Sequence, residues 1–407
     1  MFRRPCAAAG ASALAARTRG MLSRSLVAFS LALLLLGLAL RLPDRWHFAR
    51  ARPRNAALHQ LMTLQRSRAN NWTPALLLVG QWTQIVGWWG VAATGGPLAA
   101  VPASLAVAVH LRHLQEISHF AVHGVLTRSH RFGDVLADYV VHRPLALAPI
   151  SVRRSRHVRD HHPNATVAGA DPNLTDLQEA GLRPGTSRWR FRASLLYPLT
   201  GRGVRATVKT MAAAVVTAPS PRSRSTATAA VAAVPVAAYL AGGWSAVLFG
   251  VLVPRILLYP QLAWLSLLVE HTWFDPQPRT GTPARVEAGR CLRLYPHNRV
   301  LSAVASATWL PYGDLHHYAH SAHPAVRWNY LLPLERHLGH PDFTPAALLL
   351  GTPSVAQRHR RALISASSAD TQYASGDTAF AGSVQRSVMA VPENGHPVLA
   401  VGRTRSP

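Results

Sequence analysis

Residues 69–111 contain no Asp, Glu, Lys or Arg, which is an unusually long stretch for any soluble fold. A helix that spans a bilayer needs about 20 predominantly apolar residues. The stretch therefore accommodates two such helices, which we predict over residues 73–93 and 97–114, with Gly95-Gly96-Pro97 as the turn between them. This feature favours a helical membrane protein over a soluble domain.

A second apolar region, residues 225–269, contains a single charged side chain, Arg255. The pair Gly242-Gly243 divides this region, which predicts helices near 226–241 and 244–268. A charge at the depth of Arg255 is costly in lipid, so we expect its side chain to face protein or water. The two regions together predict an all-α integral membrane fold with about four transmembrane helices arranged as two hairpins.

The charge balance agrees with a membrane protein. The chain has a formal net charge of +26, but only 15% of its residues are charged and 49% are hydrophobic. A nucleic-acid-binding function is the alternative for so basic a chain. The basic residues lie between the apolar regions, however, with seven Arg in residues 41–68 and fourteen Arg and Lys in residues 128–209. The positive-inside rule places both segments in the cytoplasm, and we expect no nucleic-acid partner.

The two ends of the chain differ from its middle in composition. Residues 25–40 are Leu-rich and follow several Arg residues, which fits a signal-like segment, a short anchor or a spanning helix. Residues 355–407 are rich in Ser, Ala, Thr and Gly. We therefore expect a basic N-terminal region (1–68), a membrane domain (69–340) and a flexible C-terminal tail (341–407).

The histidines are clustered. Of 21 His, nine lie between His110 and His162 and seven between His297 and His340. His119 and His123 are spaced i, i+4, so they share a helical face and can point at one ion. An isolated pair of this kind is more often interfacial or packed in a core, and only the further clusters change that balance.

The second and third clusters have the same spacing. His157 and His161 again share a face, His162 adds a third nitrogen, and Asp160 could orient an imidazole; a solvated loop is the alternative. Four more His lie in eight residues after the second hairpin, and another closes its last helix. These are His316, His317, His320, His323 and His271.

By the predicted topology, all the clusters lie on one face of the membrane. Imidazole-rich sites suit Zn, Fe, Cu or Ni. Because eight or more candidate ligands exceed what one ion takes, we expect two ions.

The arrangement of these histidines resembles that of the membrane-bound fatty acid desaturase and hydroxylase superfamily. Its members carry three short histidine motifs, or His boxes, which correspond here to His119–His123, His157–His162 and His317–His320, in order around the two hairpins. The run from Arg159 to Leu174 and the segment Asn329-Tyr-Leu-Leu-Pro333 also resemble the family, and the resemblance covers about residues 70–340. It implies a non-haem di-iron centre at the cytoplasmic surface, held by a cytosolic helical cap that carries the boxes. The ligands implied by position are His119, His123, His157, His161, His162, His271, His317 and His320. Asp160 and Asp314 are expected to hydrogen-bond to ligand histidines and orient them.

The third box departs from the family pattern, because Ser321 stands where a second His is usual. His316 or His323 could supply the missing nitrogen. We expect His323 to do so, since a helix that ends at Pro324 would free it to swing inward.

The resemblance implies an O2-dependent desaturase of fatty acyl chains or lipids. A hydroxylase or ketolase of the same superfamily is the first alternative, and a His-rich membrane metal-binding protein without oxidase activity is the second. The two cysteines, Cys6 and Cys291, cannot form an iron–sulfur cluster. We therefore expect electrons from a separate ferredoxin- or cytochrome-type carrier. The Arg-rich face could dock an acidic carrier, although membrane topology alone also explains those Arg residues.

Overall fold

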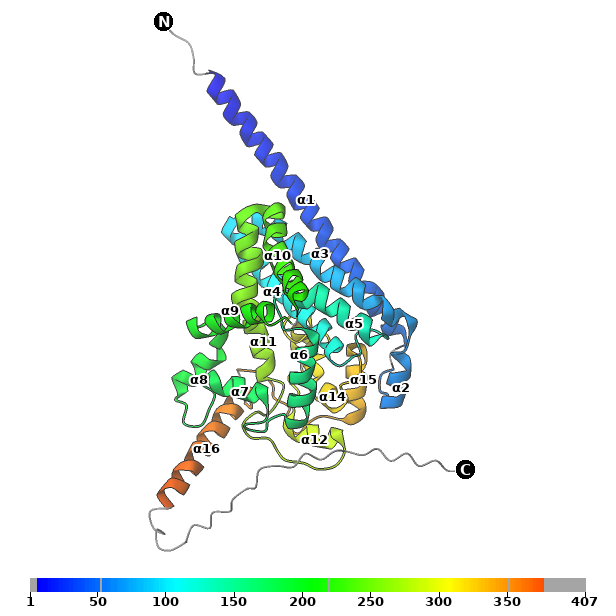
Figure 1. The fold of residues 1–407 in the computed structure, drawn as a ribbon, viewed down its shortest axis with the longest axis vertical. Helices are drawn as coiled ribbons and strands as arrows, with labels where there is room; N and C mark the ends of the chain where they lie inside the picture. The colour runs from blue at the N-terminus through cyan, green and yellow to red at the C-terminus, as the bar shows by residue number, and fades with distance from the viewer. Residues whose placement is uncertain (1–5, 52, 95, 219, 350–351, 377–407) are drawn as a thin grey trace.

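The computed structural model describes residues 6–51, 53–94, 96–218, 220–349 and 352–376, whose regular secondary structure is all helical, with isolated bridges and no strand. Figure 1 shows a bundle of long helices with shorter helices gathered at one end. The first predicted hairpin is present as α3 (Thr73–Thr94) and α4 (Gly96–Val122). The all-helical expectation is therefore confirmed for the described residues.

The second hairpin is also present. Its first arm is α10 (Pro221–Val247), which breaks at Gly242 and Gly243, and the return arm continues through η6 (Leu248–Leu252), η7 (Pro254–Leu258) and α11 (Tyr259–Leu268). Gly243 has φ +64°, a left-handed conformation that favours glycine. A Cβ on Gly242 would lie 2.7 Å from Cβ of Ala93. Glycine is thus required where this hairpin turns, and the turn lies against the end of α3.

Three segments are long and apolar enough to cross a membrane: Arg24–Phe48, Gly96–Val122 and Pro221–Leu268, the last folding back on itself. The helix α3, which contains Gln81 and Gln84, is not among them. Arg255 is buried in the last segment, where its guanidinium donates a 2.7 Å hydrogen bond to the Leu145 carbonyl. The expectation that Arg255 faces protein is confirmed.

Residues 25–40 belong to α1 (Cys6–Ala51), which packs along α3. Glycines allow this close approach, because a Cβ on Gly80 would lie 2.8 Å from the carbonyl oxygen of Gly37. Near its end, Asp44 accepts a 2.6 Å hydrogen bond from Arg327, and both side chains are buried. The helix is therefore bonded to the segment that follows the third His box.

The remaining helices form the other end of the molecule (Figure 1). They are α2 (Leu58–Leu64), η1 (Arg68–Asn71), α5 (His130–Ala137), η2 (Asp138–His142), α6 (Ile150–Arg154), η3 (Ser155–His161), η4 (His162–Asn164), α7 (Pro172–Glu179), α8 (Arg188–Leu195), η5 (Tyr197–Leu199), α9 (Gly201–Val216), α12 (Pro283–Arg290), α13 (Arg299–Ala307), η8 (Asp314–His316), α14 (His317–Ala322), α15 (Trp328–Leu338) and α16 (Val355–Gly376).

Part of the segment expected to be a flexible tail packs against the rest of the chain. Leu348, Val355 and Leu363 bury their side chains in two hydrophobic clusters formed with distant segments. Residues 377–407 of the expected tail lie outside the described residues.

Candidate metal centre

Four histidines from three segments converge at the end of α4. Nε2 of His119 lies 2.7 Å from Nε2 of His157 and 3.1 Å from Nε2 of His123. The ring of His320 packs against these rings, with centroids 4.9 Å from His119 and 4.7 Å from His123. We call His119, His123, His157 and His320 the four-histidine group; one nitrogen of each lies within 4.8 Å of the others.

A second group lies beside it. Nε2 of His317 is 3.1 Å from Nε2 of His271, and the rings of His271 and His161 have centroids 5.3 Å apart. A carboxylate oxygen of Glu270 completes the set within the same 4.8 Å limit. We call His161, Glu270, His271 and His317 the mixed group.

The separations between the ring nitrogens in both groups fit the binding of metal ions. Two imidazole nitrogens bound to one ion at about 2.1 Å and at right angles are about 3.0 Å apart, close to the separations seen here. The Nε2 atoms of His161 and His162 and both ring nitrogens of His320 are buried without a hydrogen-bond partner in the described part of the chain. Buried polar atoms are rarely left unpaired, so these nitrogens call for a ligand that the protein itself does not supply.

The imidazoles are held in the form that binds metal. Burial lowers the pKa of five of these histidines, and neighbouring imidazoles lower it further: His123, His157, His271, His317 and His320. For His162, burial lowers the pKa to about 3. Since metal binds neutral imidazole, these side chains need lose no proton at neutral pH.

Carboxylates orient one ligand in each group. In the mixed group, His161 Nδ1 donates a 2.9 Å hydrogen bond to Asp171, whose side chain is fully buried. In the four-histidine group, His119 Nδ1 donates to Glu116 over 3.3 Å. Such bonds fix the tautomer and leave Nε2 free for metal.

The two acids predicted for this role are elsewhere, which corrects the expectation. Asp160 is partly exposed, and its carboxylate pairs with Arg159 over 2.8 Å instead of with an imidazole. Asp314 is buried but bonds Arg112 over 2.7 Å and Ser266 over 2.6 Å. Asp314 therefore reaches His119 only indirectly, through the Arg112–Glu116 ion pair.

The second and third boxes each divide between the groups. His157 and His161 share a face as predicted, with stacked rings 5.3 Å apart, but they belong to different groups. The same is true of His320 and His317. His162 is beside the four-histidine group, with its ring 4.6 Å from that of His157, although it belongs to neither set.

The residues considered as substitutes for Ser321 lie outside both groups. His316 Nδ1 donates a 3.0 Å hydrogen bond to Glu335, which turns the ring toward α15. His323 is half-buried after the end of α14, and it is not among the clustered nitrogens. The preference for His323 as the substitute ligand is therefore not supported by its position.

Sequence reasoning missed Glu116, Asp171 and Glu270. Glu116 precedes His119 by three residues, a helical spacing that could have indicated contact. Glu270 is adjacent to His271. Burial raises the pKa of Glu270 well above its ordinary value, and Asp314 and Glu116 raise it further.

The groups lie at the far end of the helices from the hairpin turns. From Gly96 to His119, α4 advances about 35 Å at the usual helical rise. That length is close to the roughly 30 Å hydrocarbon core of a bilayer. A cavity of about 790 Å³ opens beside the groups, and its wall includes His119, His157 and Glu270.

Two comparisons with known proteins bear on this arrangement. The family model described as "Fatty acid desaturase" matches residues 95–348, which hold every residue of both groups. No curated protein matches the chain.

Proposed function

Because the chain belongs to the fatty acid desaturase family, we propose that it is an O2-dependent desaturase of fatty acyl chains or lipids that uses two histidine-bound iron ions. Family membership makes it an oxidoreductase, and its apolar helices indicate a membrane protein. The observation that carries the proposal is the pair of imidazole groups, with unpaired buried nitrogens, next to a cavity.

The cavity supports an elongated apolar substrate. Its volume lies within the range of about 300 to 1,000 Å³ common for ligand pockets. Its apolar wall comes mainly from α9 and α11 and includes Met211, Tyr259 and Trp264. Arg153 and Lys209 line the same cavity and would suit a carboxylate or phosphate at one end of the substrate.

Bound iron would supply the activation of O2. The overall reaction removes two hydrogens from adjacent carbons, consumes one O2, two electrons and two protons, and releases two waters. The protein residues hold the ions, bring a C–H bond of the substrate to them and shield the site within the helices. We propose that the electrons come from a separate ferredoxin- or cytochrome-type carrier, because two cysteines cannot hold an iron–sulfur cluster.

Metal analysis and lipid profiling test this function together. The purified chain should contain close to two irons and little zinc. In a host that lacks the activity, it should produce a lipid that has lost two hydrogens, and the His320→Ala variant should not. Gain of one oxygen would instead identify the hydroxylase or ketolase alternative. Stoichiometric zinc with retained activity would contradict the iron site, and bound metal without any oxidised product would favour the metal-binding alternative.

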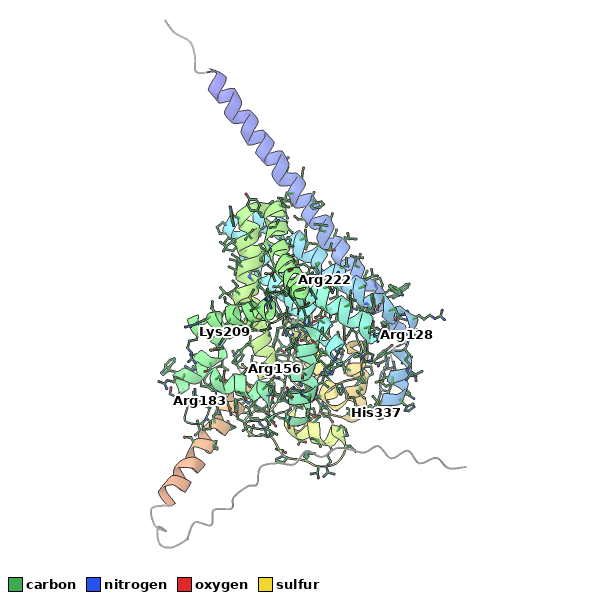
Figure 2. All side chains as sticks on the ribbon, viewed as in Figure 1. Arg128, Arg156, Arg183, Lys209, Arg222 and His337 are labelled. Atoms are coloured by element: carbon green, nitrogen blue, oxygen red, sulfur yellow. The ribbon has the colours of Figure 1, made fainter. Side chains whose placement is uncertain are left out.

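We also propose that the metal centre faces the cytoplasm. Figure 2 shows basic side chains away from the hairpin turns, among them Arg128, Arg156, Arg183, Lys209, Arg222 and His337. The positive-inside rule assigns this end to the cytoplasm. Reporters inserted at the exposed Gly185 and fused to the C-terminus should both be cytoplasmic. If the two reporters fall on opposite sides, a site on a single membrane face is impossible.

A further inference from the structure

Two carboxylates lie close to His271, and they differ in their surroundings. Glu287 accepts hydrogen bonds from Arg290 Nε over 2.9 Å and from the Cys291 thiol over 3.3 Å. The carboxylate of Glu270 makes no hydrogen bond or ion pair in the described part of the chain, yet an oxygen of it lies within 4.8 Å of the ring nitrogens of the mixed group. Glu287 is thus paired with Arg290, whereas Glu270 has no such partner among the described residues.

We propose that Glu270 is an oxygen ligand of the second metal ion. The centre would then be asymmetric, with four imidazoles around one ion, and three imidazoles and one carboxylate around the other. This inference rests on the proposed function and adds to it a ligand that the His boxes do not contain.

The electrostatics of the site support this assignment. Arg112, a cation that acts on Glu270, is already engaged by Glu116 and Asp314. The ion pairs of Arg112 therefore leave Glu270 without a cationic partner among the described residues. A metal ion held by His161, His271 and His317 would supply that cation.

The geometry of His271 excludes the other nearby acid. Its Nε2 faces His317 at 3.1 Å, while its Nδ1 faces the Cys291 sulfur at 3.5 Å on the opposite edge of the ring. The cluster of His271, Glu287 and Cys291 therefore lies behind the ring and supports it. Glu270 belongs with the nitrogens on the inner side, and it gives the mixed group a fourth donor in a chain whose third box ends at Ser321.

An oxygen ligand has a chemical consequence. Imidazole and carboxylate together are the donor set of many mononuclear non-haem iron oxygenases, and carboxylates suit hard ions better than imidazole does. The ion at Glu270 should therefore be the one that more strongly favours the ferric state. Glu270 also lines the cavity, together with His119 and His157, so both groups would border the substrate.

Iron content and Mössbauer spectra of the purified, iron-loaded full chain test the assignment. The wild type should hold two irons with two distinct quadrupole doublets. Glu270→Gln, which keeps the size but removes the charge, should hold one iron and lose one doublet. Glu270→His should hold two again, with the second doublet shifted. Glu179→Gln, an exposed acid of α7 outside both groups, serves as the matched control and should keep both irons.

The outcomes separate this inference from the proposed function. If Glu270→Gln keeps two irons and an unchanged spectrum, Glu270 is not a ligand, and the di-iron proposal stands. If Glu270→Gln and Glu270→His both insert normally in the membrane but hold no iron, the selective role of Glu270 is likewise overturned. If the wild type itself binds no iron, the proposed function fails first.

Discussion

The two metal-capable groups use the same boxes but are built differently. The four-histidine group takes two ligands from one turn at the end of α4, and its supporting bond from His119 to Glu116 is 3.3 Å long. The mixed group also draws on three segments, but its two neighbouring donors are a carboxylate and an imidazole, Glu270 and His271, and its His161 is held by a 2.9 Å bond to the fully buried Asp171. The difference shows that a His box is not equivalent to one ion, since two of the three boxes contribute to both groups. It also predicts that each ion can be removed separately.

Removing one imidazole from each group should have the largest effect. We expect His320→Ala to lose the ion of the four-histidine group and His317→Ala to lose the ion of the mixed group. Each should lower turnover more than about a hundredfold, because even the partners behind metal ligands affect affinity by 10- to 100-fold. Iron content with Mössbauer spectroscopy would identify the lost ion. Loss of the same spectral component in both variants would mean that the residues form one group.

The supporting carboxylates sharpen the comparison at a smaller scale. Asp171 also accepts hydrogen bonds from the backbone amides of Thr166 and Asn173, over 2.9 and 2.8 Å. Asp171 thus accepts three hydrogen bonds, and the side-chain amide of an Asn would place its own NH2 donor against one of these three donors. Asp171→Asn should therefore weaken binding at the mixed group by about 10- to 100-fold. Glu116→Gln should weaken the other group less, because its bond to His119 is longer. Cobalt titration of each variant measures both affinities, and equal effects would remove this distinction.

The two helical hairpins could be predicted because lipid imposes a simple rule on composition, although α3 is not among the helices long and apolar enough to cross a membrane. The charge-free stretches and the glycine pair located both hairpins. The first box was expected after a helix that ends at residue 114, whereas α4 continues to Val122. The reason is that Arg112 and Glu116 pair with each other inside the protein, so the apolar pattern ends before the helix does.

The arrangement of the site could be predicted only in part. Spacing along one helix turn correctly indicated that His119 and His123 lie together. It could not show which ligands meet across segments, because His320 reaches the first box from two hundred residues away in sequence. The supporting acids were missed for the same reason: Asp160 is adjacent to its histidine but turns outward, and Asp171 folds back from the start of α7.

Cys291 tests a weaker support within the mixed group. Its sulfur lies 3.5 Å from His271 Nδ1, and a thiol is a weak hydrogen-bonding partner. Cys291→Ser keeps a partner of similar shape, so we expect less than a tenfold change in affinity at the mixed group and none at the other. The same cobalt titration, with Cys291→Ala as the more disruptive comparison, measures this. A full loss of one ion in Cys291→Ser would identify the sulfur itself as a ligand.

The smallest effect on metal is expected at His316 and His323, although the sequence placed both near the third box. His316 is bonded to Glu335, which Arg293 also holds at 2.7 Å, and His323 is half-buried outside both groups. His316→Ala and His323→Ala, singly and together, should therefore leave iron content unchanged. His316→Ala should still lower stability by about 1.5 to 3 kcal/mol, the usual contribution of a hydrogen bond to a charged group. Iron per chain and thermal unfolding in detergent separate the two effects. A drop in iron for either single variant, with unfolding unchanged, would return that histidine to the metal site and would mean that the mixed group has an imidazole in place of the carboxylate.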